Sequence, residues 1–335
     1  MEITQPLNLF YGEPDPDRWI IFDRYPRRVL RRVIRGKQRP GGVMMIALNL
    51  IKGLEKLGHP YRFNDYKYIR SHPDEIACVI GKPHILFDRK WKNPVVLGAG
   101  VYSHPVDCPD LFERYPNVKR FLVPGPWMCK MFEPVYGDKV TAWPTGIDTD
   151  TWKPPVVDKK FDFVIYDKIR WHHDKFQTEL IKPITEVLDS LGLSYQFISY
   201  GNYGHTELMS KLAESRSVLF LCEHETQGLA YQQILSTNTP ILAWDRGGFW
   251  QDPAYYPQIK YAPVSSVPYW DERCGVKFTG LADFKAKLLE FQSKLAHFEP
   301  RKFILEDLTL ERCAEKYIDI ISEINTELQR PTPRY

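Results

Sequence analysis

One stretch, Val218–Gly248, most constrains what this chain can fold into, because its apolar pattern changes twice. It opens with the continuous apolar run Val218–Cys222, which is typical of a strand buried on both faces. A polar turn containing Gly228 follows, and from Leu229 the apolar residues take helical spacing until an Asn-Thr-Pro stop. The apolar run Ile241–Trp244 then predicts a second buried strand. Together these elements predict one βαβ unit with parallel strands.

The turn before the helix is where we expect chemistry. A helix that starts beside Gly228 directs unpaired N–H groups beyond the sheet edge, where an anion, above all a phosphate, is favoured. Glu225 stands just before that helix end, and Gln233 lies about one turn into the helix. Taken alone, the pattern fits an ordinary βαβ unit with a polar loop equally well.

Here the sequence resembles retaining glycosyltransferases of the GT-B fold, especially family 4, whose motif is Glu-x7-Glu followed by Gly-x-Pro and a Gly-Gly turn. Glu225 stands at the first glutamate and Gln233 at the second, and the Thr-Pro and Gly-Gly pairs follow in register. The resemblance implies that Glu225 faces the donor sugar and that Gln233 holds the ribose. It also implies that the backbone at Gly228 and Leu229 holds the diphosphate. Glutamine can bond a hydroxyl but lacks the charge of glutamate.

Two further segments carry the resemblance. Pro144–Pro154 (PTGIDTDTWKP) is similar to the linker between the family's domains and places the hinge near residue 150. After the apolar strand Phe161–Tyr166, Arg170 and Lys175 have the spacing of an Arg and a Lys in the family. The resemblance implies that these cations stabilise the departing diphosphate without a metal. Lys168 is the nearby substitute if the register differs.

The resemblance extends to four more residues. Gly41 and Gly42 open a predicted helix at Val43–Leu57 and would face the donor phosphates, since only glycine lets the backbone come so close. His104 follows a predicted strand and would contact the transferred sugar. Tyr200, or Tyr203 in its place, would stack on the nucleotide base.

We expect an α/β fold of the GT-B type: two Rossmann-like domains facing across a cleft, with the C-terminal helix packing back on the N-terminal domain. A chain of 335 residues suits two domains. The predicted partition is an acceptor-side domain at 1–148, a nucleotide-sugar-binding domain at 149–310, and a helix with a tail at 311–335. Further strands are expected at Leu7–Tyr11, Tyr61–Asn64, Ile76–Ile80, Ile85–Phe87, Val95–Val101, Arg120–Val123 and Tyr195–Ser199, and helices at Trp127–Tyr136, Lys175–Leu191, His205–Ala213, Leu281–Leu295 and Leu310–Leu328.

The segment Arg24–Arg39 holds seven arginines and one lysine without an acid, and its apolar residues fall on one helical face. Such an insertion fits an anionic membrane surface or a lipid-linked acceptor. A solvated face over an apolar patch and a contact with nucleic-acid phosphates are the alternatives. We favour the membrane over nucleic acid, because the formal net charge of the whole chain is only +3.

The six cysteines are scattered without a Cys-x-x-Cys pair, which indicates buried free thiols. The chain does not open with a signal peptide pattern, and no apolar run approaches the length that spans a bilayer. We therefore expect a cytoplasmic protein, peripheral on the inner face of the membrane. His172-His173 lacks a second ligand pair, so we expect no metal and no resident cofactor.

The function predicted is sugar transfer from a UDP- or GDP-linked donor to an acceptor hydroxyl on a polysaccharide, a glycolipid or a similar molecule. By resemblance the transfer is metal-independent and retains the anomeric configuration. Two alternatives stay open: a phage-type enzyme that glycosylates a modified base in DNA, and a non-catalytic subunit that binds a nucleotide sugar or a partner transferase.

Overall fold

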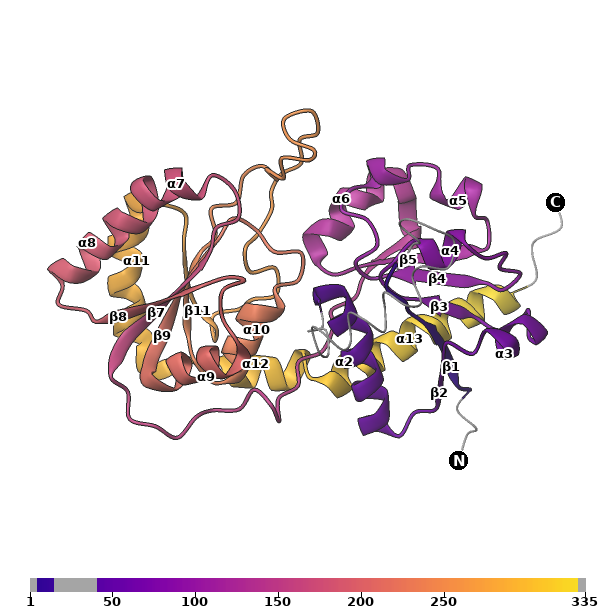
Figure 1. Ribbon diagram of the computed structural model, residues 1–335, viewed down its shortest axis with the longest axis horizontal. Helices are drawn as coiled ribbons and strands as arrows, with labels where there is room; N and C mark the ends of the chain where they lie inside the picture. Colours follow the sequence, from indigo (N-terminus) through magenta and orange to yellow (C-terminus); the bar gives the residue numbers. More distant parts are fainter. Residues whose placement is uncertain (1–4, 15–40, 331–335) are drawn as a thin grey trace, which may run out of the picture. The chain divides into compact units, whose positions relative to one another are not determined.

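The computed structural model describes residues 5–14 and 41–330, which form two compact units (Figure 1). Unit 1 contains the described residues up to Pro124, together with Phe132–Trp143 and the chain from Cys313 onwards. Unit 2 contains Gly125–Met131 and Pro144–Arg312. The basic segment Arg24–Arg39 lies outside the described residues. We keep the partition at 1–148, 149–310 and 311–335 as a proposal about independently folding domains.

Unit 1 is built on a parallel sheet of order β2-β1-β3-β4-β5-β6. Its strands are β1 (Leu7–Phe10), β2 (Tyr61–Phe63), β3 (Ala77–Val79), β4 (Val95–Gly98), β5 (Val118–Val123) and β6 (Val140–Ala142). The helices that accompany them are α2 (Gly42–Leu57), α3 (Tyr66–Ser71), α4 (His84–Phe87) and α5 (Leu111–Arg114). Two further helices, α6 (Pro126–Tyr136) and α13 (Leu310–Gln329), belong to unit 1 from Phe132 and from Cys313 onwards.

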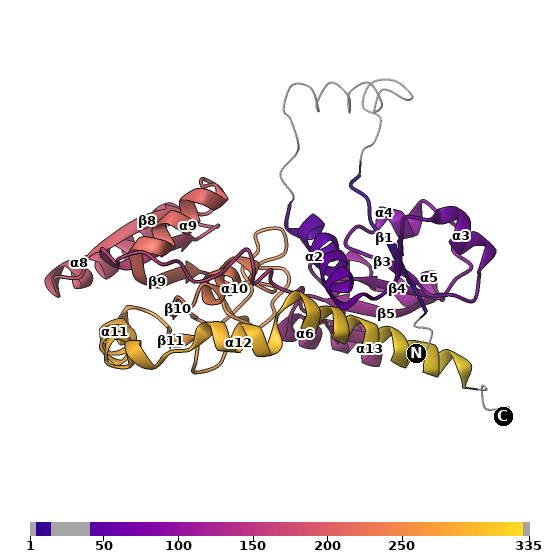
Figure 2. The ribbon, with the colours of Figure 1, turned by 90° about the horizontal axis from the view of Figure 1, so that it is seen from below.

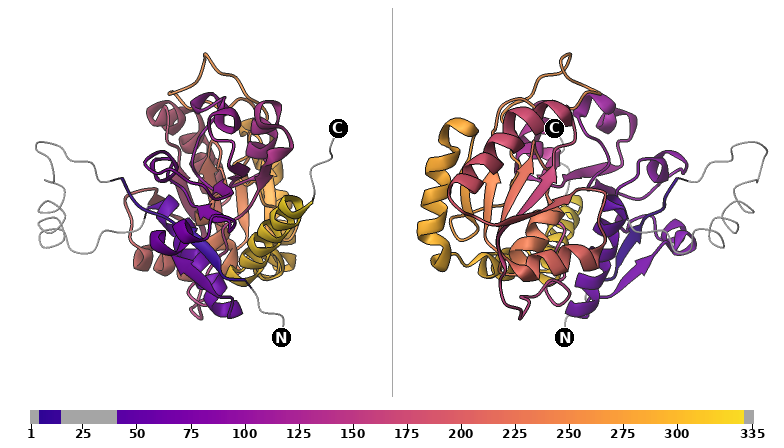
Figure 3. Two further views of the ribbon diagram at one scale, coloured as in Figure 1. Left: turned by 90° about the vertical axis from the view of Figure 1, so that its right-hand side faces the viewer. Right: turned by 60° about the vertical axis from the view of Figure 1, so that its left-hand side comes forward.

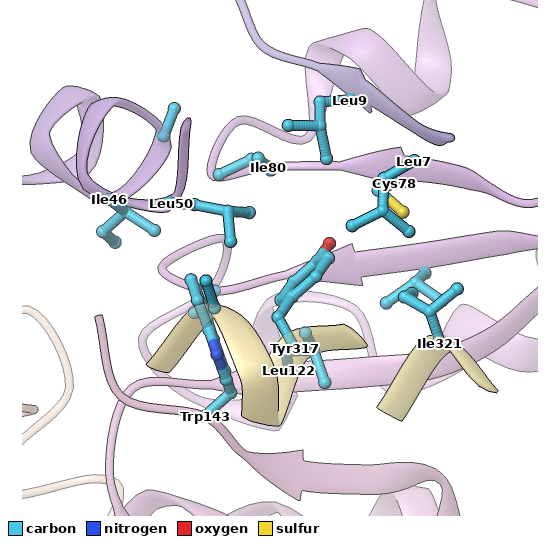
Figure 4. Close-up of a cluster of buried hydrophobic side chains, with 14 of the residues drawn as sticks. Leu7, Leu9, Ile46, Leu50, Cys78, Ile80, Leu122, Trp143, Tyr317 and Ile321 are labelled. Carbon is cyan, nitrogen blue, oxygen red and sulfur yellow. The ribbon is translucent and has the colours of Figure 1, made fainter. Parts of the chain in front are cut away.

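Successive residues of β1 serve opposite faces of this sheet, as the strand period requires. Leu7 and Leu9 join the core cluster formed with α2 and α13, drawn in Figure 4. Phe10 points to the other face, where its ring centre lies 4.9 Å from that of Tyr66 and 5.0 Å from that of Trp91. Figure 2 shows α13 running along the sheet of unit 1, where Tyr317 is fully buried. The predicted packing of the C-terminal helix on the N-terminal sheet is therefore confirmed.

Unit 2 has a parallel sheet of order β11-β10-β9-β7-β8. Its strands are β7 (Phe161–Lys168), β8 (Tyr195–Ser199), β9 (Ser215–Cys222), β10 (Ile241–Trp244) and β11 (Gly275–Phe278). Its helices are α7 (His173–Phe176), α8 (Lys182–Ser190), α9 (His205–Glu214), α10 (Leu229–Ser236), α11 (Leu281–Lys294) and α12 (Pro300–Asp307). Helices α8 and α11 bury one face of the sheet, while α9 packs against β7 and β9, so helices enclose the strands (Figure 3). The predicted βαβ unit is β9-α10-β10.

The two units confirm the predicted α/β class with two parallel sheets. One predicted strand is wrong: Ile85–Phe87 belongs to the short helix α4. Three apolar residues cannot distinguish a strand from a buried turn of helix, and Pro83 just before them is compatible with a helix start. The helix expected at Lys175–Leu191 is interrupted by a π-helical segment at Gln177–Ile181 before α8 begins.

Candidate functional site

The carboxyl ends of β7, β9 and β10 meet at one edge of the unit 2 sheet, because these strands are parallel neighbours. Lys168, the last residue of β7, lies in register with Cys222, the last residue of β9. Ligands of open α/β sheets bind at this kind of edge. The chain continues there into the loop that carries Arg170 and into the segment Glu223–Gly228.

Lys168 and Glu225 form a buried ion pair at this edge. Their side chains are only 10% and 9% exposed, and the Lys168 ammonium donates to Oε1 of Glu225. Burial by itself lowers the pKa of Lys168, but the Glu225 carboxylate outweighs burial and the pKa is raised overall. The ammonium also lies 4.3 Å from the ring centre of Tyr200, which is half exposed. Three predicted site residues therefore converge around one fixed positive charge.

The loop that carries Arg170 is held by two residues at the end of β9. Oε1 of Glu223 accepts the backbone N–H groups of Arg170 and Trp171, each at 2.9 Å. Nη2 of Arg170 donates to the carbonyl oxygen of His224 at 3.0 Å, and it lies 3.1 Å from Nε2 of the same residue. The guanidinium centre is 4.5 Å from the Trp171 ring, which stacks on His224 at 5.2 Å. Arg170 is thus a positioned cation on an otherwise exposed loop.

His224 is the neutral centre of this arrangement. Burial lowers its pKa to about 3, assisted by the positive charges of Arg170, Arg246 and Lys168. The indole of Trp250 donates to Nε2 at 3.0 Å, so Nε2 is the acceptor and the ring proton belongs on Nδ1.

Three buried polar atoms of this cluster have no hydrogen-bond partner among the described residues. They are Oε2 of Glu223, Nδ1 of His224 and Nε of Arg246. Burial lowers the pKa of Arg246, and the Glu223 carboxylate opposes that effect. Buried polar atoms are normally paired, so an acceptor and two donors together offer hydrogen bonds to a polar group from outside the chain.

The start of α10 lies directly after Glu225. Gly228 precedes the helix with φ of 86°, and a Cβ added there would lie 2.1 Å from the Tyr231 ring, so both the backbone and the packing demand glycine. No side chain caps the helix that begins at Leu229. Gln233 is half-buried on this helix, whereas its neighbour Gln232 is fully buried.

Lys175 lies apart from this cluster. It is on α7 with a side chain that is 61% exposed, and its ammonium is 3.8 Å from the carboxylate of Glu179. No contact of the described residues joins it to Glu225 or to the start of α10. Lys168, the substitute considered from the sequence, is the lysine that the fold brings to Glu225.

The remaining predicted residues belong to unit 1. Nδ1 of His104 accepts the backbone N–H of Val106 at 3.1 Å, and burial lowers the pKa of the ring, against the effect of Asp107. Gly41 precedes α2 with φ of −73°, and a Cβ at Gly41 or Gly42 would meet no described atom within 4 Å. Within the described chain, neither glycine is required by backbone or packing.

Sequence reasoning overlooked several members of this cluster, namely Glu223, His224, Arg246, Trp171 and Trp250. A signal existed, because Glu223 and His224 continue an apolar strand with polar residues just before Glu225. Across the described residues, no group of three or more His, Cys, Asp or Glu side chains could hold a metal ion. No helix of the described parts is both long and apolar enough to cross a membrane.

Neither the protein-family models nor the curated proteins contain a match to this sequence. Solved structures do resemble it. HepE of Anabaena, in complex with UDP and glucose, aligns over 95% of this chain and 100% of its own, with 11% identity and a TM-score of 0.53. The pneumococcal O-GlcNAc transferase GtfA, with UDP and GlcNAc, aligns over 79% of this chain with 16% identity and a TM-score of 0.50. TarM of S. aureus, in complex with UDP among other ligands, aligns over 82% with 15% identity and a TM-score of 0.52.

This chain spans 60% of GtfA and 58% of TarM, so much of each of those proteins lies outside the match. At such identities the likeness concerns the fold. The two parallel α/β units and these neighbours together show that the chain has the GT-B fold of glycosyltransferases.

Proposed function

We propose that this protein transfers a sugar from a nucleoside-diphosphate sugar to an acceptor hydroxyl. The observation that carries the proposal is the group of two fixed cations, Lys168 and Arg170, at the carboxyl edge of the unit 2 sheet, next to Glu225 and the uncapped start of α10. A diphosphate needs fixed positive charge and oriented N–H donors, and this edge supplies both.

In this proposal the diphosphate lies between the two cations and the Gly228–Leu229 turn. The bond between the anomeric carbon and the diphosphate oxygen breaks, and its electron pair stays on the diphosphate. The acceptor oxygen bonds to the anomeric carbon on the same face, and its proton passes to the departing phosphate oxygen. Attack on the same face would make the transfer retaining. The cations stabilise the charge that develops on the leaving group, so the transfer would be metal-independent.

The other residues would hold the donor. Tyr200 has an exposed ring beside Lys168 and would stack on the base, UDP or GDP being the nucleotide. Gln233 would bond the ribose. The unpaired atoms of Glu223, His224 and Arg246 would bond sugar hydroxyls, since a hydroxyl can both donate and accept. We retain His104, Gly41, Gly42 and Lys175 as secondary candidates, with Lys168 in the role first given to Lys175.

The acceptor would be a polysaccharide or glycolipid hydroxyl, with Arg24–Arg39 as the contact to an anionic membrane surface on the cytoplasmic side. TarM was crystallised with UDP together with Fondaparinux and α-GlcNAc-glycerol, and HepE with UDP and glucose, which supports a nucleotide-linked sugar as donor. Transfer to modified DNA remains the lesser alternative.

A non-catalytic subunit is the second candidate, because Gln233 replaces an expected glutamate and the Glu225 carboxylate is paired with Lys168. One experiment separates the two. Purified protein is incubated with UDP- and GDP-sugars, and binding is read by thermal shift while release of free UDP or GDP is read separately. Binding with turnover supports the transferase, and binding without release under any acceptor supports the subunit. Absence of binding to every nucleotide sugar refutes the transferase and a subunit that binds a nucleotide sugar.

A further inference from the structure

A cavity in unit 1 is lined by none of the residues of the candidate site. It has a volume of about 410 Å³ and lies between α3 and the segment that joins α4 to β4 (helices labelled in Figure 1). Its lining includes four cations, namely Arg70, Arg89, Lys90 and Lys92, and two aromatic rings, Tyr66 and Trp91. Among the described residues, no acidic side chain lines it.

The frame of this cavity is held by a buried amide. Asn93 is 3% exposed, and its Nδ2 donates to the carbonyl oxygens of Ile69, His72 and Glu75 at 3.2, 2.7 and 3.0 Å. These bonds tie the end of α3 to the segment before β4. The indole N–H of Trp91 donates to the carbonyl oxygen of Ile85 at 3.1 Å, which fixes the Trp91 ring in the wall of the cavity. The cavity is therefore preformed, as ligand sites usually are.

The cations of the cavity are available for a ligand. Within the described chain, none of the four forms an ion pair with a carboxylate. The guanidinium centre of Arg89 lies 3.7 Å from the ring centre of Tyr66, so stacking holds its plane. A stacked guanidinium keeps a rigid fork of N–H donors that matches a carboxylate or a phosphate. An ordinary solvent-exposed surface that carries only lysines would lack a cation fixed by stacking on an aromatic ring.

We propose that this cavity binds an anionic saccharide, meaning a sugar that carries a phosphate or a carboxylate. The cations would bind the anionic group, and the Trp91 ring would contact the sugar ring, whose C–H faces are apolar, because Arg89 already covers Tyr66. A bare anion would use only the first of these contacts, and a neutral sugar only the second. The proposal does not depend on the transferase function, because it concerns unit 1 and requires no nucleotide.

The test uses the full-length protein labelled with ¹⁵N, in which nine tryptophans each contribute an indole N–H signal. The Trp91 signal is identified by its absence in Trp91→Phe. Glucose 1-phosphate, glucuronate, glucose and inorganic phosphate are then titrated separately in the absence of nucleotide. We expect a saturable shift of the Trp91 signal with glucose 1-phosphate or glucuronate, and at least tenfold weaker binding of glucose and of phosphate.

Arg89→Gln should weaken binding of the anionic sugar about tenfold or more, because one charged hydrogen-bonding partner is lost. Lys67→Gln is the matched control: it removes one positive charge from α3 at a residue outside the cavity lining, and it should leave the affinity within about twofold. Binding of glucose 1-phosphate but not glucuronate, or of glucuronate but not glucose 1-phosphate, supports the site and defines which anionic group it binds. Equal binding of glucose and glucose 1-phosphate, an equal loss in Arg89→Gln and Lys67→Gln, or no saturable shift would overturn the proposal.

Discussion

Breaking the ion pair between Lys168 and Glu225 should cost unit 2 much more stability than removing both partners together. The two side chains are 10% and 9% exposed, so either charge left alone would be buried without compensation. Removing one partner of such a pair costs about 3–5 kcal/mol, whereas replacing both by apolar residues is often neutral or stabilising. We therefore expect Lys168→Met and Glu225→Leu each to lose about 3–5 kcal/mol, and the double variant to lie within about 2 kcal/mol of the parent.

The measurement is native-state hydrogen exchange by mass spectrometry, which resolves peptides of β7 and β9 from those of unit 1. This local readout is needed because a chain of two units need not unfold in a single step. Lys175→Met is the control, since Lys175 is 61% exposed and its loss should change stability by no more than about 0.5 kcal/mol. The reasoning fails if either single variant behaves like Lys175→Met, or if the cost in the double variant equals the sum of the single costs.

Arg170→Ala should lower the rate of nucleoside diphosphate release about a hundredfold, as loss of a positioned charge-stabilising donor does, while Lys175→Ala should change it only a few-fold; equal losses would return Lys175 to the site. The pKa of His224 is lowered to about 3 in the fold, so the unfolded chain binds more protons than the folded chain below about pH 6.5. The free energy of unfolding should therefore decrease as the pH is lowered below about 6.5. Between pH 7 and pH 5 the loss should be about 2 kcal/mol, measured as hydrogen-exchange protection of β9, and His224→Phe should lack it. Gly228→Ala should destabilise α10 by about 1–3 kcal/mol, because φ is 86° and the added methyl would meet an aromatic ring; an unchanged melting temperature would contradict this. Gln233→Glu should preserve donor binding in a thermal-shift titration, and loss of binding would show that this residue does not contact the ribose.

Much of the fold was predictable from local patterns. Long apolar runs such as Val218–Cys222 gave correct strands, and the helix at Val43–Leu57 ends at Gly58, which takes the left-handed conformation with φ of 67°. Short elements were less predictable, and Ile85–Phe87 was assigned to a strand although it is helical. Three residues carry too little periodicity to separate the two structures.

The candidate site was predictable only in part, and Lys168 shows why. In the sequence, Arg170 and Lys175 have the family's spacing, and Lys168 is one more lysine nearby. In the fold, β7 continues through Lys168, which places it opposite the end of β9 and within reach of Glu225. Lys175 falls on α7 and extends toward Glu179. Spacing along the chain cannot show which of two lysines a strand will carry into the sheet edge.

The sequence by itself determined the parallel βαβ unit around Gly228 and the resemblance to retaining GT-B transferases. These features depend on local backbone preferences and on residues close in the chain. Only the tertiary structure decided that Glu223 and His224 hold the Arg170 loop, that Lys168 pairs with Glu225, and that unit 1 has a cationic cavity beside Trp91. The physical reason is that burial, pairing and pKa depend on side chains brought together from distant segments, which no local pattern records.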